Sequence, residues 1–350
     1  MTTPQSKNEQ TQWPQDDWEV CQPQRAGMDP GALLEADGEI RARYKRINAL
    51  VLVRHKQIVF ERYYNGYSKS DVHHLASVTK SFLSALVGIA IDAGHIAGVD
   101  QKVLDFFPDY RPSRPDPAKT SLTIERLLTM SSGLPGPSRR GLEPRIERMH
   151  RSVDWLEFIL GLPLANEAKF RYNSLDSHLL SALLSRATGM AAEEFTNTHL
   201  GAPIGMTPIA DVVVHRKQVA QSRDEPKCPC WEKDPHGNNV GAAGLFLKPR
   251  DLARFGLLFL SNGMWNGRQV VSQDWVRAST RVHAGGGYGY QWWIEKEKEM
   301  YYAWGFGGQF VLVYPQLDLL AVILSDGRTH YRKNADPKEL VQRWIAAALL

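Results

Sequence analysis

Ser77-Val78-Thr79-Lys80 followed by SFLSALVGIAI, residues 77–91, is the stretch from which the rest of this chain can be interpreted. After its polar opening, apolar side chains surround nearly the whole segment, which predicts a helix buried on most sides and ended by Gly94 in a left-handed C-cap. Ser77 and Lys80 are three residues apart, so their side chains leave the same face of the helix and can meet. In the first turn, the helix macrodipole and burial both favour the neutral amine of Lys80, which can take a proton from a serine hydroxyl. Because a Ser-x-x-Lys tetrapeptide also arises by chance, the motif needs support from elsewhere in the chain.

The composition is that of an ordinary globular protein. The 350 residues are 43% hydrophobic and 23% charged, enough for a large core in one large domain or two closely packed ones. The net charge of +4 is too small to indicate a nucleic-acid partner. The most basic stretch, residues 139–151, carries Glu143 and Glu147 among its arginines at helical spacing, which favours a solvated, salt-bridged face over a polyanion site.

The sequence contains no apolar run long enough for a transmembrane helix. Residues 1–12 are polar and show no signal-peptide core, and the longest apolar run, residues 82–91, has about half the length that crossing a bilayer needs. We therefore expect a cytoplasmic protein without a membrane partner. The sequence does not decide whether a signal peptide was removed. Monomer and homodimer are both compatible with the sequence.

Three cysteines do not make a disulfide framework. Cys228 and Cys230 form a Cys-x-Cys pair with His236 beyond them, but a zinc site would need a fourth ligand that the segment does not offer. The sequence predicts reduced thiols in a loop, with no metal and no cofactor.

Strand patterns occur at both ends of the chain, with helices and long loops between them. The expected strands are Ala49–Arg54, Ile58–Tyr63, Tyr290–Glu295, Met300–Trp304, Gln309–Tyr314 and Leu319–Leu324. The expected helices include Pro30–Arg46, Ile124–Met130, Asp154–Leu160, Ser174–Ala187, Ala191–Leu200, Arg250–Leu260 and a last one opened by Asp336-Pro337-Lys338-Glu339.

This order predicts an α+β fold. One antiparallel sheet of about five to six strands would be flanked by helices, with a mainly helical second lobe. We expect residues 1–27 to form an N-terminal extension, residues 28–95 with 240–350 the sheet lobe, and residues 96–239 the helical lobe. The helix that carries Ser77 begins where the first strands end, so the active site should lie in the cleft between the lobes.

Further motifs support the Ser-x-x-Lys pair. They are Leu122–Leu134 (LTIERLLTMSSGL), Tyr172-Asn173-Ser174, Gly241–Leu245 (GAAGL), Pro249–Ala253 (PRDLA) and Trp304–Gln309 (WGFGGQ). In this order and spacing the chain resembles the serine β-lactamases and penicillin-binding proteins over roughly residues 28–330. The similarity is to the class C-like branch, which includes DD-peptidases, carboxylesterases and 6-aminohexanoate-dimer hydrolase. The resemblance implies the β-lactamase/transpeptidase-like fold.

The resemblance also implies roles for individual residues. Ser77 matches the nucleophile and Lys80 its paired base, while Tyr172 matches the tyrosine that shares the proton between nucleophile and leaving group. Whether Lys80 or Tyr172 takes the first proton stays open, and Tyr172 could alternatively be a half-buried aromatic before a helix. The backbone N–H groups of Ser77 and Phe306 match the oxyanion hole.

Two departures from the family pattern bear on the substrate. Ser174 stands where class C enzymes carry Asn, and Ala303-Trp304-Gly305 stands where they carry Lys-Thr-Gly. Ser174, Trp304, Gly305 and Gly307 are the residues we expect to contact substrate, the glycines because substrate backbone approaches that strand closely.

These features predict a serine hydrolase that forms an acyl-enzyme on short esters or linear amides, both small molecules. A class C-like β-lactamase or DD-peptidase is the alternative, because an arginine from residues 139–151 could replace the missing lysine. A second alternative is an inactive relative that binds ligands without turnover. G-x-G-x-x-G before a helix, H-E-x-x-H and G-x-S-x-G do not occur, so dinucleotide-binding, zincin and α/β-hydrolase interpretations fall away.

Overall fold

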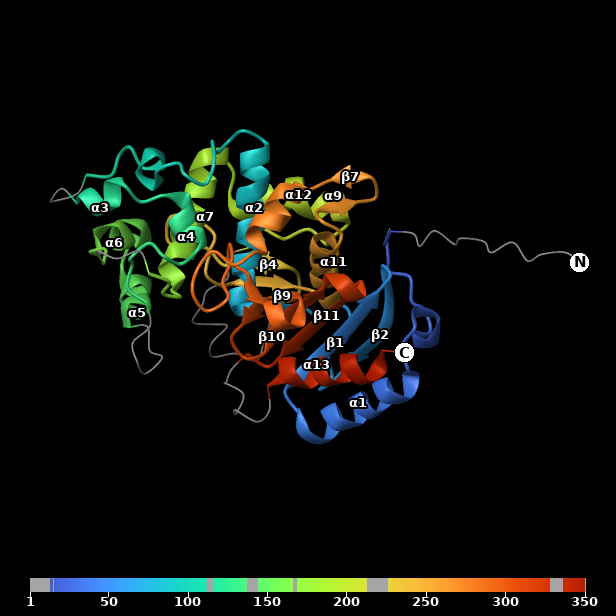
Figure 1. The fold of residues 1–350 in the computed structure, drawn as a ribbon. Helices are drawn as coiled ribbons and strands as arrows, with labels where there is room; N and C mark the ends of the chain where they lie inside the picture. Colours follow the sequence, from blue (N-terminus) through green and yellow to red (C-terminus); the bar gives the residue numbers. More distant parts are fainter. Residues whose placement is uncertain are drawn as a thin grey trace, which may run out of the picture.

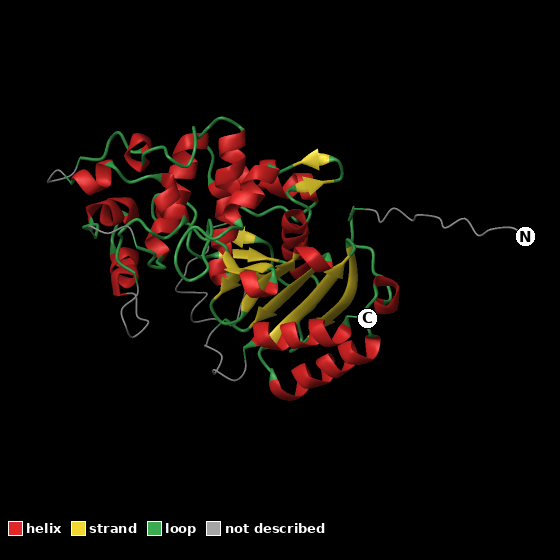
Figure 2. Ribbon diagram, in the orientation of Figure 1, coloured by secondary structure: helices red, strands yellow, loops and turns green. Residues whose placement is uncertain are grey.

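The computed structural model describes residues 13–349 except 15, 112–115, 137–143, 166–168, 213–225 and 328–335. Its centre is a six-stranded antiparallel sheet with the strand order β2-β1-β11-β10-β9-β8 (Figure 2). The strands are β1 (Ile47–Arg54), β2 (Gln57–Tyr63), β8 (Trp293–Glu295), β9 (Met300–Gly305), β10 (Gln309–Tyr314) and β11 (Leu319–Ser325). The predicted α+β fold with one sheet built from both ends of the chain is confirmed.

Both faces of this sheet are covered, so its central strands are apolar at nearly every position. In β11, Leu320 and Val322 join the core on one face, while Ala321 and Ile323 join the core on the other. Alternate side chains of a strand point to opposite faces, which explains why the buried run is continuous rather than alternating.

The two terminal helices cover one face. Helix α1 (Pro30–Arg43) packs against α13 (Pro337–Ala348), and both lie along the sheet in Figure 1. Each begins in the same way, with an aspartate side chain, Asp29 or Asp336, that accepts a hydrogen bond from a backbone N–H two residues later, and with proline at the first helical position. The predicted terminal helices are thus confirmed, although α1 ends three residues before Arg46.

Helices α2 (Thr79–Asp92) and α11 (Pro249–Leu260) lie on the other face. The rings of Phe82 and Phe255 stack with centroids 3.7 Å apart, and α11 packs directly on β11, β10 and β1. Helix α2 is buried at every position from Thr79 to Ala90, as its all-round apolar sequence predicts.

The first helices from the middle of the chain gather at the left of Figure 1, beyond α2. They are α3 (Pro117–Thr120), α4 (Ile124–Leu128), α5 (Pro144–Arg151), α6 (Trp155–Gly161) and α7 (Ser174–Thr188). They are followed by α8 (Ala192–Thr196) and by α9 (Ala202–Ile204), which lies on the other side of α2 and contacts α11. Helix α7 contacts α2, α4, α6 and α8, and so joins these helices to the one that follows Ser77. The remaining elements are α12 (Gln273–Ser279), the hairpin β6 (Met264–Trp265) with β7 (Arg268–Gln269), and a small sheet of β3 (His73–His74), β5 (Leu245–Leu247) and β4 (Cys230–Trp231).

Three predicted boundaries are wrong for local backbone reasons. The strand expected from Tyr290 starts only at Trp293, because Gln291 has a φ of +62°, which strand backbone does not adopt. The helix expected to reach Met130 ends at Leu128, since Met130 has a φ of +55°. The single helix expected over 191–200 is α8 followed by a π-helical turn, Asn197–Gly201, that leads into α9. Among the described residues, no helix is both long and apolar enough to span a bilayer.

Candidate active site

Ser77 lies on a sharp turn that leads into α2. The turn is a 3₁₀ segment, Ala76–Val78, and the α-helix itself begins at Thr79, so Ser77 precedes the helix that it was expected to open. Ala76 has a φ of +46°, an uncommon conformation for a residue with a Cβ. The Thr79 hydroxyl donates a hydrogen bond to the Ala76 carbonyl (2.7 Å) and accepts one from the Leu245 N–H (3.4 Å), which ties the turn to β5. Ser77 itself is half-buried.

Lys80 reaches back from the first turn of α2 to Ser77. Its side chain is buried, with 1% of the residue exposed. Its Nζ donates to Ser77 Oγ over 2.9 Å and to the carbonyl oxygen of Ala242 over 2.7 Å. The Ser-x-x-Lys spacing therefore brings the two side chains together as predicted, and the Gly241–Gly244 loop supplies a second oxygen for the amine.

The ring of Tyr172 also lies near this amine. Lys80 Nζ is 5.2 Å from the centroid of the Tyr172 ring. The segment that carries Tyr172 is fixed at both ends, because the Arg171 N–H donates to the Met130 carbonyl (2.8 Å) and Asn173 caps α7 by accepting from the Asp176 N–H (2.8 Å). The structure thus brings all three predicted catalytic side chains into one cluster. Ser174, the first residue of α7, is half-buried two positions after Tyr172.

A buried carboxyl group that the sequence analysis missed lies under this segment. Asp176 accepts a hydrogen bond from Ser132 Oγ (2.5 Å) and one from Asn173 Nδ2 (2.9 Å). Burial raises the pKa of Asp176 to about 7, although these two hydrogen bonds act in the other direction. Asp176 links the turn after α4 to the start of α7. An acidic residue three positions after the Asn173 cap is the signal that could have indicated it.

Strand β9 reaches the Ser77 turn because Gly305 has no side chain. A Cβ there would lie 2.3 Å from the carbonyl oxygen of Leu75 and 3.2 Å from the Cβ of Ala76. Gly307 is also required, since its φ is +80° and a Cβ would lie 2.5 Å from the Gly327 Cα. The close approach of β9 brings the backbone around Phe306, the residue after Gly305, to the turn that holds Ser77.

Aromatic rings form one side of the cluster. Trp293, at the start of β8, lies between Tyr172 (ring centroids 5.7 Å apart, stacked) and Trp304 (5.8 Å, edge to face). Trp304 and Phe306 are 41% and 42% exposed, whereas Ala303 of β9 is buried in the core that also contains the apolar residues of α2. Trp293 was not predicted, because its place beside Tyr172 depends on the turn at Gln291.

Comparison with known proteins agrees with this arrangement. The family model described as Beta-lactamase matches residues 36–342. The chain belongs to the β-lactamase family. A 6-aminohexanoate-dimer hydrolase of Paenarthrobacter ureafaciens is 26% identical over 322 residues, which cover 85% of this chain and 77% of that protein. Esterase EstB of Burkholderia gladioli is 27% identical over 176 residues, 45% of this chain and 44% of the esterase.

Solved structures of the family show the same fold. A penicillin-binding protein from Bacillus halodurans superposes with a TM-score of 0.66 at 17% identity, covering 89% of this chain and 99% of its own. A family VIII carboxylesterase also gives 0.66 at 17% identity, covering 91% and 97%. The two curated relatives are named as hydrolases, one a 6-aminohexanoate-dimer hydrolase and the other an esterase.

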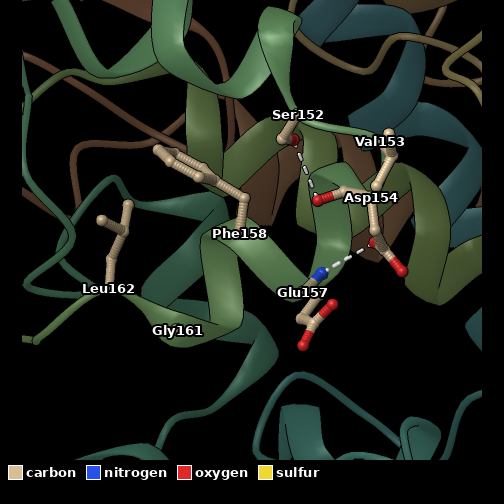
Figure 3. Close-up of a pocket in the computed structure, with 7 residues that line it drawn as sticks. All are labelled: Ser152, Val153, Asp154, Glu157, Phe158, Gly161 and Leu162. Carbon is tan, nitrogen blue, oxygen red and sulfur yellow. Dashed lines mark hydrogen bonds between the residues drawn. The ribbon is translucent and has the colours of Figure 1, made fainter.

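A separate surface concavity of this β-lactamase-family chain lies on α6 and the turn before it (Figure 3). It is lined by Ser152, Val153, Asp154, Glu157, Phe158, Gly161 and Leu162. Ser77, Lys80 and Tyr172 are not among its lining residues, so it is not the site built around the amine. On the neighbouring α5, Arg145, Arg148 and Arg151 are exposed, and Arg148 lies over the Phe158 ring; Arg139, Arg140 and Glu143 lie outside the described residues.

The cysteines differ from expectation in one respect. Cys230 is not in a loop but buried in β4, where burial raises the pKa of its thiol to about 12. Cys228 is exposed, and both are free thiols. In the part of the chain that the structure describes, no three His, Cys, Asp or Glu side chains group as metal ligands would.

Proposed function

We propose that this protein is a serine hydrolase that works through an acyl-enzyme on Ser77. The observation that carries the proposal is the buried amine of Lys80, 2.9 Å from Ser77 Oγ. Burying a lysine amine away from water costs free energy, so a purely structural role is a poor explanation for it. A serine nucleophile, in contrast, needs a base at this distance.

In the proposed reaction, Ser77 Oγ attacks the carbonyl carbon of an ester or amide. Before the attack the Ser77 hydroxyl donates its hydrogen bond to the neutral Lys80 amine, and during the attack this amine, directly or through Tyr172, accepts the hydroxyl proton. The N–H groups of Ser77 and Phe306 stabilise the oxyanion. The same proton passes to the departing alcohol or amine as the carbonyl–heteroatom bond breaks. Water then attacks the acyl carbon and gives a proton to the base. The base passes this proton to Ser77 Oγ as the bond between the acyl carbon and Oγ breaks, which releases the acid and restores the Ser77 hydroxyl.

We place this site between a sheet lobe (28–95 with 240–350) and a helical lobe (96–239), with residues 1–27 as an extension. Ser174, Trp304, Gly305 and Gly307 would border the substrate. The position of the family's Lys-Thr-Gly lysine is taken by buried Ala303, and the threonine by Trp304 with its ring partly exposed. Neither offers a cation or a hydroxyl for a substrate carboxylate. Short uncharged esters and linear amides need no such anchor, and we therefore propose them as the substrates.

A class C-like β-lactamase or DD-peptidase would need that anchor. Losing one charge-assisted hydrogen bond costs about 1.5–3 kcal/mol, a ten- to hundredfold slower reaction. The test compares kcat/KM for nitrocefin and p-nitrophenyl butyrate on one preparation, with Ser77→Ala as the control. We expect the ester to be the better substrate and Ser77→Ala to abolish its turnover. A clear preference for nitrocefin would overturn the substrate class, and turnover of neither substrate would favour the inactive ligand-binding relative.

A further inference from the structure

The loop that faces Lys80 is short and closely packed. Its Ala242 carbonyl accepts a hydrogen bond from Lys80 Nζ over 2.7 Å. At one end, a Cβ on Gly241 would lie 2.0 Å from the carbonyl oxygen of Ser177 in α7, and at the other, Gly244 has a φ of +86°. The position of the carbonyl that holds the amine therefore depends on how the two glycines at the ends of the loop are fixed.

An imidazole ring accepts a hydrogen bond at each end of this loop. The Gly241 N–H points to His178 Nδ1 (3.5 Å), and the Gly244 N–H points to His74 Nε2 (3.3 Å). A ring nitrogen can accept a hydrogen bond only when it carries no proton. The two histidines come from different elements, α7 and β3, so the loop is held from two independent sides.

A carboxylate determines which nitrogen of His178 carries the proton. His178 Nε2 lies 3.2 Å from Asp234 Oδ2, and both side chains are buried. Asp234 also accepts hydrogen bonds from the N–H groups of His236 and Asn238 (2.8 Å each). Burial opposes ionisation of Asp234, but the hydrogen bonds from His178 and Asn238 outweigh it and lower the pKa of this carboxyl. An ionised Asp234 can only accept, so Nε2 bears the proton and Nδ1 is left free to accept from Gly241.

We propose that His178 and His74 are positioning residues for Lys80. Through Gly241 and Gly244 they hold the Ala242 carbonyl on the Lys80 amine, so that the amine is oriented toward Ser77 Oγ. Neither histidine is within the Ser77, Lys80 and Tyr172 cluster, and both act through the loop. This inference rests on the proposed function, in which Lys80 is the base.

The two rings use different nitrogens, which allows a crossed test. An asparagine amide can place its oxygen near the position of Nδ1, and a glutamine amide near that of Nε2. At position 178, His178→Asn keeps an acceptor for Gly241 and His178→Gln loses it. At position 74 the order is reversed, because His74→Gln keeps the acceptor for Gly244 and His74→Asn loses it. A general loss of stability would not reverse the order of the Asn and Gln variants between the two positions. His95→Gln, at an exposed histidine, is the matched control.

Two readouts are measured on the full chain: the rate of Ser77 labelling by a fluorophosphonate, and deuterium uptake of a peptide covering residues 240–245. We expect His178→Gln and His74→Asn to slow labelling at least tenfold and to raise uptake in this peptide. His178→Asn and His74→Gln should stay within threefold of wild type, as should the His95→Gln control.

Equal behaviour of Asn and Gln at each position, in either readout, would overturn the proposal. If wild-type Ser77 is not labelled at all, the proposed function fails, and deuterium uptake alone then decides this inference. The crossed pattern in uptake would support the two imidazoles as anchors of the loop, and unchanged uptake in all four variants would contradict it.

Discussion

Lys80 is buried at a position where an ionisable side chain contributes little to the stability of the fold. Removing an ammonium from water costs several kcal/mol, and a well-packed apolar side chain of similar size often serves stability as well or better. Here Lys80 is 1% exposed as a residue, and its amine forms hydrogen bonds to Ser77 Oγ and the Ala242 carbonyl. A buried ionisable group next to a nucleophile is typical of a functional site rather than of a structural one.

Substitutions at Lys80 and Tyr172 should therefore separate activity from stability. We expect Lys80→Met and Tyr172→Phe each to slow acylation by roughly 10²–10⁴-fold, because each removes part of the proposed proton path. The double variant should be little slower than either single one, since residues that act as a unit are not additive. Thermal unfolding should show Lys80→Met at least as stable as wild type. Ester hydrolysis at the wild-type rate by Tyr172→Phe would mean that Tyr172 only packs against Trp293.

At the scale of elements, the site depends on the approach of β9 to the Ser77 turn. Gly305→Ala would place a Cβ 2.3 Å from the Leu75 carbonyl oxygen, so the strand or the turn must move. A shift of about 1 Å at a reacting group can cost roughly a hundredfold in rate, and we expect a loss of that order in kcat/KM for p-nitrophenyl butyrate.

Gly38→Ala is the matched control for this substitution. Gly38 is exposed inside α1, and a Cβ there meets nothing within 4 Å. We expect it to leave the rate unchanged and to stabilise the protein by up to about 1 kcal/mol, the difference in helix propensity. A Gly305→Ala variant as active as Gly38→Ala would show that the contact between β9 and the turn is not needed.

The elements that could be predicted from sequence are those decided by local pattern. The α2 segment is apolar on all sides, and the strands β1, β10 and β11 are largely apolar runs between turn residues, while β2 has an apolar centre at residues 58–60. The features that were missed depend on contacts between distant segments. Gln291 is held at a positive φ by hydrogen bonds to the Leu127 and Leu128 carbonyls and from Ser177, more than a hundred residues away. Trp293 follows this turn and owes its place beside Tyr172 to it.

The same distinction applies to the candidate site. Ser77 and Lys80 meet because they are three residues apart on one chain segment, which spacing alone indicates. The Tyr172 position came from a resemblance between motifs, not from periodicity. Asp176 and the His178–Asp234 pair carry no local signature strong enough to show that they lie beneath Tyr172 and the Gly241–Gly244 loop.

At the scale of the whole molecule, one ion cluster joins the N-terminal segment to the sheet and to α11. Arg250 binds Glu61 of β2 through two hydrogen bonds (2.7 and 2.8 Å) and also contacts Asp17. Burial opposes ionisation of Glu61, but the hydrogen bonds from Arg250 and Tyr63 outweigh it and hold the pKa of this carboxyl below its ordinary value. Its stabilisation is complete above the unfolded pKa of about 4.3 and is lost as pH falls through the lower folded pKa.

We expect Glu61→Gln to lower the free energy of unfolding by roughly 1.5–3 kcal/mol at pH 7, the usual range for hydrogen bonds to charged groups. The difference from wild type should shrink below about pH 4, where Glu61 itself becomes protonated. Urea unfolding at pH 7, 5 and 3.5 measures it, with Glu297→Gln at an exposed glutamate as the control. A difference that does not change with pH would rule out the charge as its source.

The most direct test of the account is the mass of the protein during turnover. Rapid acid quenching of the enzyme with p-nitrophenyl butyrate, followed by intact-mass and peptide analysis, should show one added butyryl group on the peptide that contains Ser77. Ser77→Ala should show no such group and no burst of nitrophenol. A butyryl group on another residue, or ester turnover by Ser77→Ala at the wild-type rate, would contradict the assignment of Ser77 as the nucleophile.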